Sequence, residues 1–166
     1  MGRVFDDDRI ADSVEGLIDF CKDWLTPDIV MAEIGCFRGV STSIFAQRVK
    51  HVFAVDPWMS RTDYFEIPHD MMATAEAQFY KMRESHPNIT KYKMPSVLAA
   101  LRFADEELDA VYIDGDHSET AVRADLAAWI PKVKKGGLIA GHDYCMVGSL
   151  VPKVMVYPEQ TWVYRK

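Results

Sequence analysis

Cysteine is scarce in this sequence, and the three copies show no pattern of a metal site or a disulfide framework. Cys21, Cys36 and Cys145 are an odd number, and no two of them form a C-x-x-C pair. Such usage is typical of free thiols in a reducing compartment. Long apolar runs are missing as well, and the first ten residues, MGRVFDDDRI, lack the apolar stretch of a signal peptide. We therefore expect a cytoplasmic protein with no membrane partner.

Positive charge is also in short supply. The 166 residues include 19 Lys and Arg against 25 Asp and Glu, which gives a formal net charge of −6. An obligate nucleic-acid partner needs a basic face for its phosphates, so we expect no such partner. Core-forming residues are plentiful, since 49% of the chain is hydrophobic and 27% is charged, as in globular proteins. The length fits one domain, to which we assign residues 1–166.

Short apolar runs alternate with segments of helical periodicity along most of the chain. The apolar runs predict buried strands at residues 29–35, 51–56, 88–94, 109–114 and 136–144. The periodic segments predict helices at residues 12–25, 41–50, 71–86, 96–103 and 119–130. Residues 57–70 contain two prolines and no clear period, which favours a loop. This alternation predicts an α/β fold with a doubly wound, mostly parallel sheet.

The last fourteen residues, KVMVYPEQTWVYRK, have a different pattern. Two β-rich runs flank Pro158, Glu159 and Gln160, and they predict an antiparallel hairpin. Together with the five strands before it, the hairpin completes a Rossmann-like, seven-stranded sheet with an antiparallel C-terminal edge. Its apolar runs, VMVY and WVY, predict an apolar edge of the kind that becomes an interface. We therefore expect a homo-oligomer.

The end of the first expected strand carries the features of a ligand-binding loop. In doubly wound sheets ligands bind beyond the carboxyl ends of the strands. Here Glu33 is followed by Gly35 and Gly39, which let a ligand approach the backbone, and the next helix offers its N-terminus. The spacing is not G-x-G-x-x-G, so the loop is a poorer cradle for a pyrophosphate. Ordinary turn glycines remain an alternative.

An acid ends the second expected strand. Asp56 stands before Pro57, about twenty residues after the glycines, where an acid can bind a ribose diol. Each of its two charge-assisted hydrogen bonds would contribute roughly 1.5–3 kcal/mol. An Asp before Pro is also a common turn residue, but in company with Glu33 and Gly35 it favours a nucleoside-containing cofactor. We expect the side chain at an exposed strand tip.

Acids and histidines follow the fourth and fifth expected strands. The stretch VYIDGDHS places Asp114, Asp116 and His117 after one strand, and His142 and Asp143 end the other. If the two strands are neighbours, all five side chains gather at one edge of the sheet. Carboxylates with imidazoles suit a divalent metal, a general base or both. His142 can equally be a histidine that only satisfies its loop. The D-x-D-x-[ST] pattern of haloacid-dehalogenase-type phosphatases also matches, but too little chain follows for their downstream residues.

Four segments together resemble a known family. AEIGCFRGVSTSIFA, VFAVDPW, the run from Val111 to Tyr144 and the closing TWVYRK resemble class I S-adenosylmethionine-dependent methyltransferases. Among these, the chain is most similar to the small-molecule O-methyltransferases related to catechol and macrolide-sugar O-methyltransferases. The resemblance covers residues 12–144 and the last strand. It implies S-adenosylmethionine as cofactor and methyl transfer to a hydroxyl of a small molecule.

The resemblance also implies roles for individual residues. Cofactor contacts would come from Glu33, Gly35, Phe37, Gly39, Ser41, Asp56, Pro57, Ser96, Asp114 and Gly115. Among these Asp56 would hold the ribose hydroxyls, and residues 94–96 would border the adenine. Asp114 and Asp143, with His142 where relatives usually have a carboxylate, would bind Mg²⁺ or another divalent cation. His117 would be the catalytic base and would act together with Asp114.

Two alternatives to this function stay open. One is a NAD-dependent oxidoreductase on the same sheet, which the missing G-x-G-x-x-G disfavours. The other is a catalytically silent S-adenosylmethionine-binding protein, because the connection after Tyr144 is shorter than relatives usually have. The residues of the acceptor pocket are also undecided. Two alternatives exist for Trp58, Tyr64, Phe65 and His69, which would either line the pocket or pack on the helix that follows.

Overall fold

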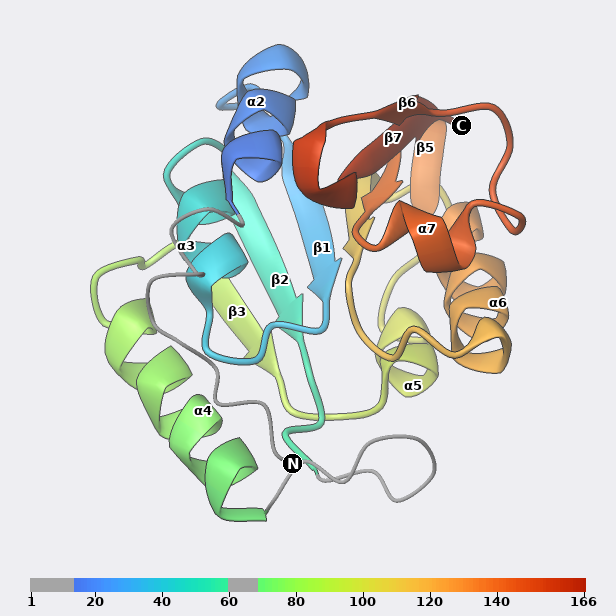
Figure 1. Ribbon diagram of the computed structural model, residues 1–166. Coiled ribbons are helices and arrows are strands. Elements are labelled where there is room, and N and C mark those ends of the chain that lie inside the picture. The colour runs from blue at the N-terminus through green and yellow to red at the C-terminus, as the bar shows by residue number, and fades with distance from the viewer. Residues whose placement is uncertain (1–13, 60–68) are drawn as a thin grey trace.

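A seven-stranded sheet forms the centre of the computed structural model, which describes residues 14–59 and 69–166 (Figure 1). The strand order is β3-β2-β1-β4-β5-β7-β6. The strands are β1 Val30–Ile34, β2 His51–Val55, β3 Ile89–Tyr92, β4 Leu108–Ile113, β5 Val133–Gly141, β6 Met155–Val156 and β7 Trp162–Arg165. The first five are parallel, and β7 pairs antiparallel with both β5 and β6. The predicted Rossmann-like sheet with an antiparallel C-terminal hairpin is therefore confirmed.

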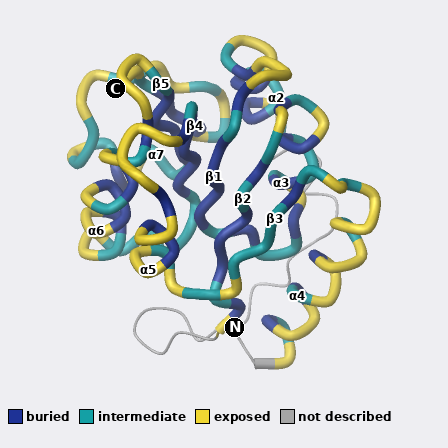
Figure 2. Tube along the Cα trace, turned by 180° about the vertical axis from the view of Figure 1, so that it is seen from behind, coloured by how far each residue is buried: buried dark blue, intermediate teal, exposed yellow. Residues whose placement is uncertain are grey.

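Helices cover both faces of the sheet, because successive strand residues point to opposite sides. On one face α2 Glu15–Trp24, α3 Val40–Ala46 and α4 His69–Arg83 pack on strand residues such as Met31. On the other face α5 Ser96–Ala100 and α6 Glu119–Trp129 pack on residues such as Ala32. The middle strands, which lie between these two layers, run dark blue through Figure 2. Short 3-10 turns, η1 Ile130–Lys132 and η2 Pro158–Gln160, follow α6 and precede β7.

The fifth strand and its surroundings differ from the sequence-based expectation. β5 begins at Val133, so the glycine pair lies inside the strand and does not open it, and the strand ends at Gly141. A shift in register between Leu108 and Ala110 lets β5 carry extra residues opposite β4. The expected strand extended to Tyr144, but Tyr144 is the first residue of the short helix α7, Tyr144–Val147. Charged residues at the start of β5 are exposed, so apolar periodicity could not mark its beginning.

The surface features bear on two further expectations. In the part of the chain described, no helix has both the length and the apolar character needed to cross a bilayer. Met155 and Val156 of the edge strand β6 are 52% and 44% exposed, and Met146 of α7 is exposed as well. Oligomer formation through this edge remains a prediction. The three cysteines are free: Cys21 and Cys36 are buried, and Cys145 is exposed on α7.

Candidate functional site

The loop between β1 and α3 is shaped by close packing. Gly35 and Gly39 have φ values of 86° and 84°, in the left-handed region that favours glycine. A Cβ on Gly35 would lie 2.2 Å from the carbonyl oxygen of Asp114, and one on Gly39 would lie 2.9 Å from Cδ2 of Phe79 in α4. Both glycines are thus required by neighbouring parts of the protein. Phe37 between them also has a positive φ, 45°.

Asp56 is buried, so the expectation of an exposed strand tip is wrong. Only 6% of the residue is accessible, because the side chain turns back onto the loop after β1. Oδ2 accepts hydrogen bonds from the backbone N–H groups of Cys36 at 3.0 Å and Phe37 at 2.9 Å. Oδ1 accepts one from the N–H of Trp58 at 2.6 Å. A carboxylate has about four acceptor positions, so one remains for a ligand hydroxyl.

Glu33 brings a second carboxyl group beneath the same loop. It is fully buried, and its Oε1 accepts a hydrogen bond from the hydroxyl of Ser41. Burial raises the pKa of Glu33 to about 7, although the bond from Ser41 acts in the opposite direction. Its other oxygen, Oε2, has no hydrogen-bond partner within residues 14–59 and 69–166. A buried acceptor without a partner is costly, and a ligand donor would remove that cost.

Asp114, His117 and Asp143 converge at the ends of β4 and β5. The two strands are neighbours, with Ile113 paired to Gly141, so the side chains that follow them meet at one edge of the sheet. One ligand atom from each of the three lies within 4.8 Å of the others, which is the spacing of a metal-binding group. Nε2 of His117 is 3.2 Å from Oδ2 of Asp143. Asp116 accepts a hydrogen bond from the N–H of Ser118 at the start of α6.

His142 lies beside the same two acids. Its Nδ1 is 3.3 Å from Oδ2 of Asp143 and 3.9 Å from Oδ1 of Asp114. Trp162 of β7 fixes the backbone here, because its indole N–H donates to the carbonyl of His142 at 2.9 Å. Sequence reasoning grouped His142 with the acids and reserved His117 as a base. The geometry gives both histidines a place in the acid–histidine cluster, defined here as Asp114, His117, His142 and Asp143.

Burial and mutual charge set the protonation of this cluster. Burial raises the pKa of Asp114 to about 7, against the lowering effect of His142. A hydrogen bond to Asp143 raises the pKa of His142, and the same bond lowers the pKa of Asp143. The contact therefore favours the charged forms of His142 and Asp143, whereas burial favours the protonated form of Asp114.

The donor set of the cluster fits a divalent cation. Two carboxylates and an imidazole are typical ligands of Mn²⁺, Fe²⁺ and Zn²⁺. Mg²⁺ prefers oxygen ligands alone, so a histidine in the set makes it the poorer match.

The other residues implied by the resemblance have varied surroundings. The hydroxyl of Ser96 accepts the indole N–H of Trp129 at 2.8 Å, which fixes the start of α5. An open hollow of about 400 Å³ beside it is lined by Met94, Leu98, Leu101 and Arg102. Gly115 follows Asp114 directly, and a Cβ there would make only ordinary contacts, the nearest at 3.7 Å.

Of the four residues suggested for an acceptor pocket, the structure describes the environment of Trp58. It is 5% exposed, and its ring packs on Phe79 of α4 with centroids 4.9 Å apart, so it is a packing residue. Tyr64 and Phe65 lie outside the described residues, as does the side chain of His69. Sequence reasoning missed the polar role of Trp58, whose Nε1 donates to the carbonyl of Phe37 at 2.8 Å. The signal was present, because a buried tryptophan usually needs a partner for its N–H.

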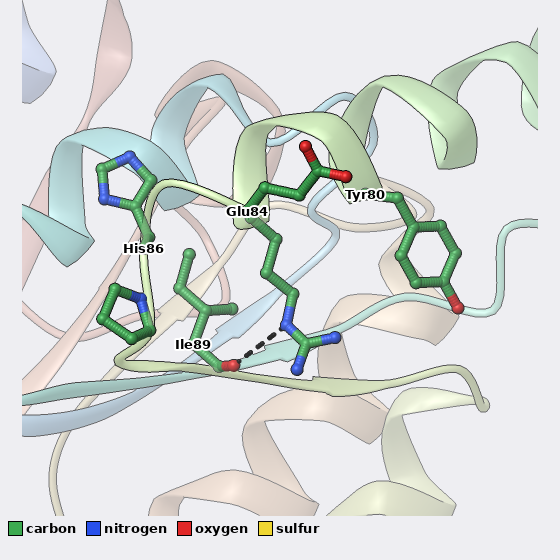
Figure 3. Close-up of a pocket in the computed structure, with 6 residues that line it drawn as sticks. Tyr80, Glu84, His86 and Ile89 are labelled. Carbon is green, nitrogen blue, oxygen red and sulfur yellow. Dashed lines mark hydrogen bonds between the residues drawn. The ribbon is translucent and has the colours of Figure 1, made fainter.

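A second hollow, of about 270 Å³, lies between α4 and β3 and is not lined by any residue expected in the site. Its walls are Tyr80, Arg83, Glu84, His86, Pro87 and Ile89 (Figure 3). Nε of Arg83 donates to the carbonyl of Ile89 at 3.2 Å, and the His86 ring pairs with the hydroxyl of Ser43. These contacts join the end of α4 to β3 and the turn that follows α4 to α3.

Comparison with known proteins adds a family to this geometry. A family model described as a methyltransferase domain matches residues 32–144, more than half of the chain. A curated relative, uncharacterized protein R132 of Acanthamoeba polyphaga mimivirus, is 27% identical over 120 residues, which cover 70% of this chain. The chain spans 52% of the length of that relative.

Solved structures show how widely this fold is used. An rRNA methylase from Streptococcus thermophilus has a TM-score of 0.63 at 12% identity, covering 91% of this chain and 93% of its own. The N-methyltransferase NodS of Bradyrhizobium japonicum, solved with S-adenosyl-l-homocysteine, has a TM-score of 0.63 at 13% identity, covering 98% and 89%. A precorrin 8W decarboxylase from Methanobacterium thermoautotrophicum has a TM-score of 0.58 at 16% identity, and the match covers 100% of this chain and 88% of its own. At these identities the likeness concerns the fold.

Proposed function

Because this chain belongs to the methyltransferase-domain family, we propose that it transfers a methyl group from S-adenosylmethionine to a hydroxyl of a small molecule. The observation that carries the proposal is the convergence of Asp114, His117 and Asp143 at the edge of the sheet where the loop after β1 also lies. A methyl acceptor that is a hydroxyl must lose a proton, and this cluster offers groups that can take it. The net charge of −6 favours a small acceptor over nucleic acid.

The cofactor would lie over the loop between β1 and α3. Asp56 retains one acceptor position for a ribose hydroxyl, and the unpartnered Oε2 of Glu33 is suited to a ligand donor. The C-terminal end of β3 and the start of α5, with Met94 and Ser96, would border the adenine. NodS, which shares the fold, was solved with S-adenosyl-l-homocysteine, and this supports the choice of cofactor.

The chemistry requires one displacement and one proton transfer. The acceptor oxygen attacks the methyl carbon of the sulfonium, the new C–O bond forms as the C–S bond breaks, and S-adenosylhomocysteine leaves as a neutral thioether. Nε2 of His117 faces Asp143, so Nδ1 is the nitrogen available to take the hydroxyl proton. The carboxylate of Asp143 then stabilises the imidazolium. A general base of this kind contributes about 10²–10⁴-fold in rate.

A divalent cation at the cluster would lower the pKa of the acceptor hydroxyl. Asp114 and Asp143 would supply two carboxylates, and the third ligand would be His142 or His117. Only the first arrangement leaves His117 free to take the proton, and it is the one we propose. The sequence-based choice of ligands, Asp114, His142 and Asp143, is therefore retained.

Titration calorimetry and a turnover assay test this function. We expect S-adenosylmethionine and S-adenosylhomocysteine to bind more tightly than NAD, and a panel of hydroxylated small molecules to yield S-adenosylhomocysteine. Removing divalent metal with a chelator should reduce turnover, and Mn²⁺ or Mg²⁺ should restore it. Preference for NAD would overturn the proposal, and cofactor binding without turnover on any acceptor would favour the catalytically silent alternative. If a chelator has no effect on turnover, Asp114 and Asp143 hold no catalytic metal and act only by pairing with the charges of neighbouring residues.

A further inference from the structure

Lys91 of β3 carries a buried charge that the proposed chemistry does not use. Its side chain is only 6% exposed, and its Nζ lies 2.5 Å from Oε1 of Glu76 in α4. The same Nζ lies 3.8 Å from the ring centroid of Tyr80 and 4.2 Å from that of Trp58. A buried ammonium is costly unless it is well paired, and here one carboxylate and two aromatic faces surround it. A desolvated cation–π contact of this kind is attractive, so Lys91 holds the indole of Trp58 from one side.

The indole of Trp58 is held from other directions as well. Phe79 of α4 packs against it with centroids 4.9 Å apart, and the residue is 5% exposed. Its backbone φ is 45°, in the left-handed region, which is unfavourable for a residue with a side chain. The surroundings of the ring offset that cost. The ring therefore has a defined position, and so does its N–H group.

That N–H group determines the backbone of the loop expected to bind the cofactor. Nε1 of Trp58 donates to the carbonyl of Phe37 at 2.8 Å, and the N–H of Phe37 donates to Asp56 at 2.9 Å. Both polar backbone groups of Phe37 are thus bonded to residues that directly follow β2. Phe37 itself has a φ of 45°, so the loop follows an uncommon path between its two glycines. Without the indole bond, the carbonyl of Phe37 would be free to turn.

We propose that Lys91 and Trp58 are positioning residues that hold the loop after β1 in its cofactor-binding conformation. Lys91 fixes the indole, the indole fixes the carbonyl of Phe37, and neither side chain needs to touch the cofactor. A ligand binds more weakly when only a fraction of the protein is in the competent conformation. Weakening this series of contacts therefore lowers the affinity for the cofactor. The inference rests on the proposed function, because the loop is taken to bind S-adenosylmethionine.

Three variants and one control test the proposal. Trp58→Phe keeps a ring and removes the N–H. Lys91→Met removes the charge and leaves Glu76 paired with Lys93, whose Nζ is 2.6 Å from Oε2. Lys91→Arg keeps a cation over the rings. The control, Trp24→Phe, removes an indole hydrogen bond of the same length, 2.8 Å, to the hydroxyl of Tyr157.

We expect Trp58→Phe to weaken S-adenosylhomocysteine binding about tenfold in calorimetry, as for the loss of one hydrogen bond. Lys91→Met should weaken binding to a similar extent, because the indole loses the cation that holds it over the loop. Lys91→Arg should stay within about twofold of wild type, and Trp24→Phe should bind like wild type. Amide hydrogen exchange at Phe37, Arg38 and Gly39 should accelerate in the two weakened variants only. Thermal unfolding of all four variants separates these effects from general destabilisation.

Wild-type affinity in both Trp58→Phe and Lys91→Met would overturn the positioning role. So would a loss of affinity that follows the unfolding temperature across all variants, Trp24→Phe included. If Trp58→Phe does not fold, the comparison of Lys91→Met with Lys91→Arg tests the proposal instead. Equal S-adenosylhomocysteine affinities of these two variants would then overturn it. Failure of the wild type itself to bind S-adenosylhomocysteine would instead refute the proposed function, and the positioning role with it.

Discussion

The loop after β1 and the acid–histidine cluster lie at the same edge of the sheet, but different forces hold them. In the loop, backbone N–H groups of Cys36 and Phe37 donate to the buried carboxylate of Asp56. In the cluster, contacts join half-buried side chains such as His117 and Asp143, which are 35% and 29% exposed. Contacts of the first kind determine a backbone path, whereas those of the second kind determine charge. Substitutions in the loop should therefore affect folding and cofactor affinity, and those in the cluster should affect rate.

The largest expected effect is on rate, at His117. His117→Ala should reduce turnover about 10²–10⁴-fold at neutral pH and leave S-adenosylhomocysteine affinity unchanged, because the variant removes only the proposed proton acceptor. The loss should shrink at high pH or with an acceptor whose hydroxyl is already acidic. Steady-state rates over a pH series, with calorimetry alongside, provide the measurement. Full activity of the variant on a weakly acidic alcohol would show that His117 is not the base.

The next effect is on stability, at Asp56. Asp56→Ala leaves three backbone N–H groups without their acceptor in a buried place, so unfolding should become easier by about 4 kcal/mol. Denaturant unfolding measures this, and affinity for S-adenosylhomocysteine should fall with it. As a matched control, Asp28→Ala removes an exposed carboxylate that bonds to Thr26 and should change little. Equal stability of the two variants would mean that Asp56 does not hold the loop.

A smaller, pH-dependent effect is expected at Glu33. Its pKa is about 7 in the folded protein against 4.5 in the unfolded chain, so the folded state binds the extra proton between these values. The stability that Glu33 contributes is therefore fully present below about pH 4.5 and is lost as the pH rises through about 7. The loss amounts to about 3 kcal/mol between pH 4 and pH 8.

Glu33→Gln tests this because it keeps an acceptor for Ser41 and removes the titration. Its stability should therefore fall less than that of the wild type as the pH rises from 4 to 8. Denaturant unfolding at several pH values measures how the free energy of unfolding of each protein depends on pH. The pKa of Asp114 is also raised, so Asp114→Asn measures the part of the pH dependence that comes from Asp114. A constant difference between wild type and Glu33→Gln over this range would contradict the assignment.

The sequence predicted the sheet and the meeting of the acids for a simple physical reason. Apolar runs alternate with helical periodicity, and parallel strands bring their carboxyl ends to one edge, so Asp114 and Asp143 had to be close once β4 and β5 were neighbours. The pairing of β4 with β5 is itself a property of the whole fold, and the sequence of neither strand predicts it.

Two features could not be predicted from the sequence. Whether a carboxylate at a strand end faces solvent or turns back depends on the backbone around it, and Asp56 turns back to the N–H groups of its neighbours. The second is the position of the two histidines. Asp143 has a φ of 53°, and the turn there brings His142 and His117 to the same carboxylate. Residue spacing carries no signal for such a local turn.

The uneven exposure of the cysteines makes the protein suited to chemical labelling. Burial raises the pKa of the Cys21 thiol to about 12 and also raises that of Cys36, so neither forms a reactive thiolate in the folded state. Cys145 is exposed on α7, two positions after Asp143. A maleimide fluorophore would therefore attach at Cys145 alone. Its emission would report whether a ligand binds near the acid–histidine cluster, with no engineered residue.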